Sequence, residues 1–314
     1  MAEAAEIPSA PAAPGAPAAT AGAPRSLPRA LVVSARPKQW VKNVLVAAAP
    51  AAAGVLGQWW AVRDTLVAFG AFCLAAGGTY LLNDALDVDA DRRHERKRLR
   101  PVAAGEVPVP VAHGAGLTLA LAGVGLGFAA SRQLALVVGL YLVFTTAYTL
   151  WLKHLAVLDL GMVASGFVLR LIGGAVAVGV PISVWFIVVG SFGSLFMVAG
   201  KRHAEHLDLG AARADHRATL SEYSLAYLGY VRAVASGVAM VGYALWAFEA
   251  HAGRPGVIWF ELSIAPFVLA ILRYALIVER GEAGAPEDVV LGDRPLQVLG
   301  AIWAALLVVG LYVV

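Results

Sequence analysis

The sequence predicts an all-α, polytopic integral membrane protein with nine transmembrane helices, and two observations support this fold class. Of its 314 residues, 60% are hydrophobic and only 14% are charged, whereas soluble chains carry about 25% charged residues. Nine apolar stretches also come close to the ~20 residues that a helix needs to cross the bilayer core. They cover residues 43–61, 64–83, 111–130, 132–152, 155–179, 182–200, 226–250, 257–279 and 296–314.

The chain divides into a tail and one membrane domain. Residues 1–28 are rich in alanine and proline and have no early basic segment, so we expect a disordered cytoplasmic tail and no cleaved signal peptide. Residues 29–314 contain every apolar stretch and form the transmembrane domain. The lone cysteine, Cys73, lies inside an apolar stretch, which excludes a disulfide framework.

The basic residues predict the orientation in the membrane. Lysine and arginine collect on the cytoplasmic side of membrane proteins, and a cytoplasmic N-terminus places most of the 24 basic residues on that side. The two long charged segments, 84–110 and 201–225, then face the cytoplasm together. We therefore expect a multi-pass protein of the plasma membrane whose active site takes a soluble anionic substrate from the cytosol.

A cluster of carboxylates at the end of the second apolar stretch predicts a magnesium site. In helical geometry Asp84, Asp87 and Asp91 share one face, while Asp89 points away from it. Asn83 lies on the same side as Asp87 and Asp91. Hard oxygen ligands suit Mg²⁺, which proteins usually hold with one or two carboxylates together with substrate phosphates. An interfacial cap neutralised by the following basic run is the alternative, but clustered like charges favour a bound cation.

Basic residues on either side of this cluster are candidates for binding phosphate. The run from Arg92 to Arg100 serves as a topology determinant and a contact for anionic lipids. A minority of the run, with Arg98 as the candidate, could clamp phosphate oxygens. Lys42 and Asn43 lie at the start of the first apolar stretch and are assigned to a substrate phosphate, with a simple interfacial anchor as the alternative.

Further polar groups lie at or within the central apolar stretches. Tyr148 and Lys153 close the fourth stretch, where Lys153 could also snorkel to the interface. Asp159 and Arg170 lie inside the fifth stretch, three helical turns apart on one face. An ionisable residue within a span is by default a candidate for function. A structural role for Arg170, packing helices or pairing with backbone carbonyls, stays open.

The segment after the sixth stretch has a different character. Lys201, Arg202 and Glu205 fall on one helical face and mix basic with acidic groups, so their chemistry should differ from that of the aspartates. The sequence holds no Walker-type glycine loop, no Cys/His cluster, no G-x-S-x-G elbow and no dinucleotide fingerprint. ATP hydrolysis, zinc chemistry and acyl transfer are therefore disfavoured, and no nucleic-acid partner is expected.

Several of these motifs resemble those of one membrane enzyme family. The pattern N-D-x-x-D-x-x-x-D at 83–91, the pattern Y-x-x-x-x-K at 148–153 and the nine-span layout resemble the UbiA superfamily of intramembrane prenyltransferases. Longer segments, at 36–44, 97–105, 185–202 and 265–275, resemble one branch of that superfamily, and this likeness runs from about residue 30 to the C-terminus. The resemblance implies a UbiA-type helical bundle.

The resemblance to that branch also implies an activity. Its members transfer 5-phosphoribosyl from phosphoribosyl pyrophosphate to a polyprenyl (decaprenyl) phosphate and release pyrophosphate, for the synthesis of cell-wall arabinan precursors. The implied cofactor is Mg²⁺, held by Asn83, Asp84, Asp87 and Asp91, with Tyr148 and Lys153 as further catalytic residues. The expected substrate-binding residues are Lys42, Asn43, Asp91, Arg98, Asp159, Arg170, Lys201, Arg202 and Glu205.

Two other functions remain as alternatives at this point. UbiA-type aromatic prenyltransferases use a prenyl diphosphate and carry a second aspartate-rich motif after the sixth span. Here Lys201-Arg202-His203-Ala204-Glu205 stands in that place, which favours a phosphate-bearing sugar donor. A secondary transporter is the non-enzyme alternative, because Asp159 and Arg170 could line a pathway. The expected partners are the sugar donor, the lipid phosphate, the bilayer and a second copy of the chain as a homo-oligomer.

Overall fold

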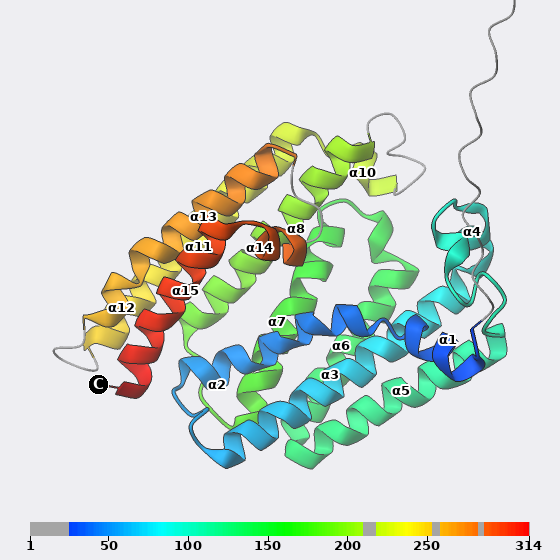
Figure 1. Cartoon of the computed structure of the whole chain (residues 1–314), viewed down its shortest axis with the longest axis horizontal. Coiled ribbons are helices and arrows are strands. Elements are labelled where there is room, and N and C mark those ends of the chain that lie inside the picture. Colours follow the sequence, from blue (N-terminus) through cyan, green and yellow to red (C-terminus); the bar gives the residue numbers. More distant parts are fainter. Residues whose placement is uncertain (1–24, 210–217, 253–257, 282–285, 314) are drawn as a thin grey trace, which may run out of the picture.

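The computed structural model describes residues 25–209, 218–252, 258–281 and 286–313, and all regular structure in these ranges is helical (Figure 1). Most of the predicted tail and the middle of the predicted 201–225 loop lie outside them. The elements are α1 Leu27–Ser34, η1 Pro37–Ala47, α2 Ala48–Ala52, α3 Trp59–Leu86, α4 Val88–Arg93, η2 Lys97–Leu99, α5 Val109–Ala130, α6 Arg132–Leu150, η3 Leu152–His154, α7 Leu158–Val178, α8 Val184–Leu209, α10 Ala218–Glu222, α11 Leu225–Ala252, α12 Trp259–Leu262, α13 Ile264–Glu279, α14 Pro286–Gly292, α15 Arg294–Val308 and η5 Val309–Val313.

The predicted all-α membrane fold is confirmed. Within the described residues, eight helical segments are long and apolar enough to cross a membrane. They correspond in order to the last eight predicted spans, with ends that differ by a few residues. The seventh of them combines α12 with α13, and the eighth combines α15 with η5.

The first predicted span, 43–61, differs from the prediction in its bounds and in its helix type. A 3₁₀ helix, η1, begins at Pro37, and the short helix α2 follows it and ends at Ala52. Pro50, within α2, has no N–H to donate to the carbonyl of Val46, so one α-helical hydrogen bond is missing where η1 meets α2. That carbonyl packs onto α7 at Gly174, where an added Cβ would lie only 1.8 Å from it.

The 3₁₀ geometry still lets this segment traverse the molecule. A 3₁₀ helix rises about 2.0 Å per residue and an α-helix about 1.5 Å, so η1 and α2 together extend roughly 30 Å, the thickness of the bilayer core. Figure 1 shows this blue segment running along α3 from the end that carries α1 to the opposite end. Among the described residues, eight segments therefore qualify as spans by length and composition, and η1 with α2 takes the place of the predicted first span.

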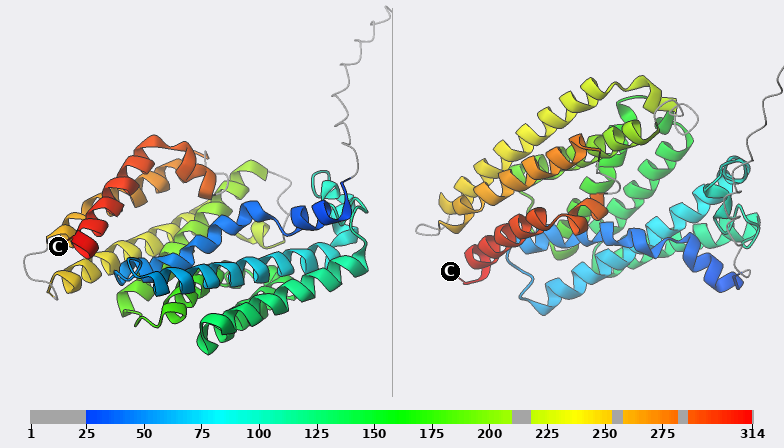
Figure 2. Two further views of the ribbon diagram at one scale, coloured as in Figure 1. Left: turned by 60° about the horizontal axis from the view of Figure 1, so that its bottom comes forward. Right: turned by 45° about the horizontal axis from the view of Figure 1, so that its top comes forward.

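The helices form two packed groups. Phe72 of α3, Leu134 and Tyr141 of α6 and Val46 of η1 belong to one buried core. A second core lies among α8, α11, α13, α14 and α15 and is built around Phe196. Figure 2 shows the red, orange and yellow C-terminal helices on one side of the molecule and the blue to teal N-terminal helices on the other. Helix α7 contacts both α3 and α8 and so joins the two groups.

The predicted functional segments meet at one end of this bundle. The C-terminal ends of α3, α6 and α8 and the N-terminal end of α7 lie there, together with α4 and α10 (Figure 1). The two predicted loops are more helical than expected. Helix α3 extends to Leu86 and is followed by α4, and α8 continues to Leu209, so Lys201, Arg202 and Glu205 lie on a helix.

Candidate active site

The structure brings Asp84 and Asp91 together and leaves Asp89 at the surface, as the helical spacing predicts, although these residues do not share one continuous helix. Helix α3 ends at Leu86, and α4 begins one residue after Asp87. The side chains of Asp84 and Asp91 are only 1% and 3% exposed, whereas that of Asp89 is 80% exposed and pairs with Arg92 on the surface. The change of helix direction at Asp87 keeps Asp84 and Asp91 on the inner side.

One arginine joins the two buried carboxylates. The Nη1 atom of Arg100 lies 2.7 Å from Oδ2 of Asp91 and 3.2 Å from Oδ1 of Asp84, so it donates to both. Arg36 donates from Nη2 to the same Oδ1 of Asp84 at 2.5 Å. Burying two carboxylates side by side is unfavourable unless cations accompany them. The two guanidinium groups supply that compensation.

Arg36 reaches Asp84 from a strained backbone. Its φ of 53° lies in the left-handed region, which non-glycine residues rarely adopt, and it directly precedes Pro37, which restricts it further. Strain of this kind costs about 1–3 kcal/mol and persists only where surrounding contacts enforce it. The ion pair with Asp84 and the ring of Tyr80, 4.8 Å below the guanidinium, are those contacts.

The half-buried Asp87 and Asn83 form the open side of this site. A short helix, η3, places Lys153 so that its Nζ lies 3.6 Å from Oδ1 of Asp87. The predicted catalytic residues Asp87 and Lys153 are therefore brought together. Tyr148, near the C-terminal end of α6, interacts electrostatically with Arg202 of the second predicted loop.

The residues of this site fit a magnesium ion that arrives with phosphate ligands. The described part of the chain holds no group of three His, Cys, Asp or Glu arranged to bind a metal alone. However, oxygens of Asp84 and Asp91 both lie within hydrogen-bond distance of one charged nitrogen, so a cation is already placed between them. Mg²⁺ is usually held by one or two carboxylates with substrate phosphates, and these two carboxylates match that donor set.

A second charged cluster joins α7 to α8. Both oxygens of Asp159 are engaged, one by the hydroxyl of Tyr223 and the other by Nε of Arg202 at 3.2 Å. Arg202 also donates to Glu205 at 2.7 Å, and Lys201 lies 3.9 Å from the same carboxylate. The side chains of Asp159 and Arg202 are 0% and 4% exposed. These contacts hold Arg202 in one orientation.

Tyr223 fixes the start of α7 at a strained residue. Its hydroxyl accepts a hydrogen bond from the backbone N–H of Val157 at 2.6 Å and donates to Asp159. Val157 has a φ of 70°, an outlier for a β-branched residue. Burial, followed by the hydrogen bond to Asp159, raises the pKa of the Tyr223 hydroxyl. The hydroxyl therefore stays protonated and keeps donating at physiological pH.

Two predicted substrate contacts bind each other instead. Asn43 is fully buried, accepts a 2.7 Å hydrogen bond from Nε of Arg170 and donates to the sulfur of Cys73. Arg170 also donates to the carbonyl of Gly166, and its guanidinium stacks on the ring of Tyr141. This geometry favours helix packing for both residues, the structural role that the sequence left open for Arg170, over a contact with a substrate phosphate.

Two further predicted phosphate ligands, Lys42 and Arg98, are respectively half-buried and exposed. Arg98 is exposed in η2, and Lys42 donates to the side chain of Gln39 at 2.6 Å. Their assignment to a phosphate stays a prediction.

Sequence reasoning missed Arg36, Arg100 and Tyr223 as members of these clusters. Arg100 is one of six basic residues between 92 and 100, and only the path of the backbone after η2 distinguishes it. Arg36 carried only the general signal of a basic residue at the cytoplasmic entry of a span. Tyr223 carried none.

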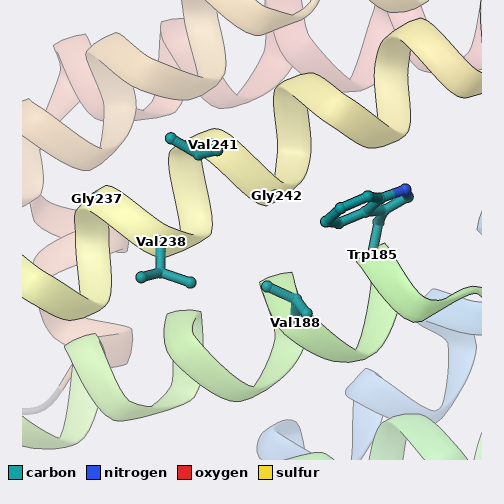
Figure 3. Close-up of a pocket in the computed structure, with 6 residues that line it drawn as sticks. All are labelled: Trp185, Val188, Gly237, Val238, Val241 and Gly242. Atoms are coloured by element: carbon teal, nitrogen blue, oxygen red, sulfur yellow. The ribbon is translucent and has the colours of Figure 1, made fainter.

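An apolar pocket of about 240 Å³ lies elsewhere, between α8 and α11 (Figure 3). Trp185 and Val188 line it from α8, and Gly237 and Val241 line it from α11. Val188 is thirteen residues from Lys201, so the pocket lies roughly 20 Å along α8 from the charged clusters. It holds no group that could take part in phosphate chemistry.

Comparison with known proteins identifies the family. The family model for the UbiA prenyltransferase family matches residues 43–292, so the chain belongs to this family. The decaprenyl-phosphate phosphoribosyltransferase of Corynebacterium glutamicum is 43% identical over 296 residues, which are 92% of this chain and 89% of that protein. The protein of the same name from Mycobacterium tuberculosis is 44% identical over 286 residues, 90% of this chain and 94% of that protein.

Solved structures show the same fold. A UbiA homologue from Archaeoglobus fulgidus bound to GPP and Mg²⁺ has a TM-score of 0.67 at 16% identity, covering 90% of this chain and 98% of that chain. The apo homologue from Aeropyrum pernix K1 has a TM-score of 0.60 at 17% identity, covering 88% of this chain and 98% of that chain. The implied UbiA-type bundle is confirmed, and the chain is a membrane-embedded transferase.

Proposed function

We propose that this chain transfers the 5-phosphoribosyl group of phosphoribosyl pyrophosphate to a decaprenyl or similar polyprenyl phosphate and releases pyrophosphate. The observation that carries the proposal is the buried pair Asp84 and Asp91 with cations around it, at one end of an apolar bundle. Relatives that bear the corresponding enzyme name match about nine-tenths of the chain at 43–44% identity. The role in cell-wall precursor synthesis belongs to the same proposal.

The first step that the chain performs is to bind the diphosphate of the donor. Asp84 and Asp91, with Asp87 and Asn83 on the open side, would hold Mg²⁺, which supplies Lewis-acid stabilisation of the departing diphosphate. The presence of Mg²⁺ with a prenyl diphosphate in the Archaeoglobus structure supports this cofactor at the level of the family. Arg36, Arg100 and Lys153 add positive charge at the rim.

The chain then positions two reactants that need no proton transfer. The oxygen of the lipid phosphate is already an anion, so it attacks C1 of the ribose without a general base. A C1–O bond to the lipid phosphate forms as the C1–O bond to the diphosphate breaks, and the electron pair leaves with pyrophosphate. Orientation and fixed charges then supply the rate enhancement. We assign Lys201 of α8 and Tyr148, near the end of α6, to orienting the lipid phosphate.

The proposed arrangement in the membrane follows from the same geometry. The distribution of basic residues assigns the end of the bundle with the charged clusters to the cytoplasm. The soluble donor would enter the site from that side. The prenyl tail lies among apolar helix faces, where each buried CH₂ contributes ~0.8 kcal/mol. The groove between α8 and α11 (Figure 3) is apolar and offers room for part of such a chain.

An assay of donors tests the proposal against the aromatic prenyltransferase alternative. Purified protein would be given phosphoribosyl pyrophosphate with decaprenyl phosphate, or a prenyl diphosphate with an aromatic acid, and the release of pyrophosphate would be followed. We expect turnover with the first pair alone. Turnover with the second pair, and none with the first, would refute the proposal. The transporter alternative finds no support in the relatives, which are named as transferases.

A further inference from the structure

Arg100 bridges the two carboxylates that are proposed to hold the metal. Its Nη1 atom is within hydrogen-bond distance of oxygens from both Asp84 and Asp91, and the side chain is 28% exposed where the two carboxylates are nearly fully buried. The guanidinium therefore extends from the partly exposed edge of the site to the two buried carboxylates.

The charge balance of the site is complete without a metal. Two buried carboxylates face two guanidinium groups, those of Arg36 and Arg100. A divalent cation added to this arrangement would stand beside two like charges, which is unfavourable in a partly buried site. A diphosphate that enters together with the cation makes binding favourable, because its negative oxygens offset the added positive charge and can pair with an arginine.

The two arginines differ in their freedom to move. Arg36 is held by its neighbour Pro37, by a strained φ and by the ring of Tyr80. Arg100 has an extended backbone after η2 and directly precedes the turn at Pro101. Its long side chain needs only rotamer changes to turn outward. Its planar fork matches phosphate oxygens as well as carboxylates.

We propose that Arg100 exchanges partners during loading: it bridges Asp84 and Asp91 in the metal-free protein, and it moves to the donor's diphosphate when Mg²⁺ and the diphosphate enter together. This inference rests on the proposed function and deepens it. Arg100 then acts twice, first as a counter-charge that keeps the carboxylates together and next as a ligand of the leaving group. The site consequently binds metal and diphosphate cooperatively, and each raises the affinity for the other by the same factor.

Thermal unfolding of the purified full chain in detergent tests this exchange. Melting temperatures would be measured with MgCl₂ alone, with pyrophosphate alone, and with both at a fixed free Mg²⁺ concentration. For the wild-type protein we expect a shift with both that exceeds the sum of the separate shifts. In R100Q, Mg²⁺ alone should stabilise at about tenfold lower concentration, and the excess shift with pyrophosphate should disappear.

A matched variant and a conservative variant complete the test. R93Q removes a charge from the exposed Arg93 of α4 in the same basic run and should behave like the wild-type protein. R100K keeps one cation in place, so it should keep weak binding of Mg²⁺ alone while losing most of the cooperativity. If R100Q does not fold without metal, the R100K result decides.

The outcomes separate this inference from the proposed function. Unchanged Mg²⁺ dependence in R100Q, or full cooperativity in R100K, would overturn the exchange even where phosphoribosyl transfer is intact. Loss of cooperativity in both variants, with no turnover of phosphoribosyl pyrophosphate by the wild-type protein, would retain the exchange and refute the choice of donor.

Discussion

The two charged clusters contain similar residues but differ in how deeply their arginines are buried. Around Asp84 and Asp91 the cations reach in from the rim, with Arg36 and Arg100 still 29% and 28% exposed. Around Asp159 the arginine itself is buried, and both carboxylate oxygens are engaged by Arg202 and Tyr223. The partly exposed arginines of the first cluster can change partners when a ligand enters, whereas Asp159 and Arg202 are buried with their partners.

This difference assigns separate tasks to the two clusters. We infer that the first binds the diphosphate and its metal, and that the second fixes the relative placement of α7 and α8 on which the site depends. The second aspartate-rich motif expected of an aromatic prenyltransferase is replaced by this closed ion pair. Variants that remove one group from each cluster should therefore affect different observables.

The largest effect is expected at Asp84. The D84N variant keeps the shape of the side chain but removes the charge that would hold the metal, so the rate of phosphoribosyl transfer should fall at least about a thousandfold, roughly 4 kcal/mol of transition-state stabilisation. Initial rates with labelled donor measure this. D89N is the control, because Asp89 is exposed and points away. Equal losses in the two variants would contradict the assignment of the inner face.

At Tyr223 we expect loss of stability accompanied by a smaller loss of rate. Y223F removes the hydroxyl that bonds Asp159 and the N–H of Val157, and an unsatisfied buried polar group costs about 1–3 kcal/mol. The melting temperature should fall, and kcat should fall about tenfold through misplacement of Arg202, while the Mg²⁺ dependence stays as in the wild-type protein. Y227F is the control, because it removes a neighbouring hydroxyl but keeps the ring that stacks on Tyr223. A shifted Mg²⁺ dependence in Y223F would show that the two clusters are one site.

At Arg170 we expect a change in stability alone. R170M leaves the buried carbonyl of Asn43 without its donor, which should lower the free energy of unfolding by about 1–3 kcal/mol. Because this pair packs helices, the KM for the sugar donor in the folded fraction should be unchanged. A marked rise in that KM would restore the sequence-based prediction that Arg170 contacts substrate.

The smallest effect is expected at Asp293, which belongs to neither cluster. This carboxylate caps α15 and accepts two hydrogen bonds from Arg273, which lower its pKa. A lowered pKa stabilises the folded state above the unfolded pKa, and this contribution disappears as the pH falls through the folded value. D293N still caps the helix, so it should melt slightly below the wild-type protein at neutral pH and equally in acid. A difference that persists in acid would exclude the charge as its cause.

The sequence predicted the helices and the aspartate face well, because both follow from local periodicity. Apolar runs of about twenty residues have one stable form in a bilayer, and the spacing of Asp84 and Asp91 survives the change of helix at Asp87. The 3₁₀ form of the first span was not predicted, since it depends on Pro50 and on the close approach of Gly174 from another helix.

The partners of the charged groups could not be predicted from periodicity. In the sequence, nothing distinguishes Arg100 from its five basic neighbours. Nothing in the sequence indicates that Arg170 pairs with Asn43, 127 positions away. Long-range pairs depend on the tertiary path, which single-sequence patterns do not encode. The roles of Lys42, Arg98 and Lys201 as phosphate ligands stay predictions.

The divalent requirement of the reaction tests the central claim most directly. The rate of phosphoribosyl transfer to polyprenyl phosphate would be measured in excess chelator and again after Mg²⁺ is restored. We predict a rate at background in chelator and full recovery with Mg²⁺, because the carboxylates at the end of α3 need a cation to take the diphosphate. An undiminished rate in chelator would contradict the account.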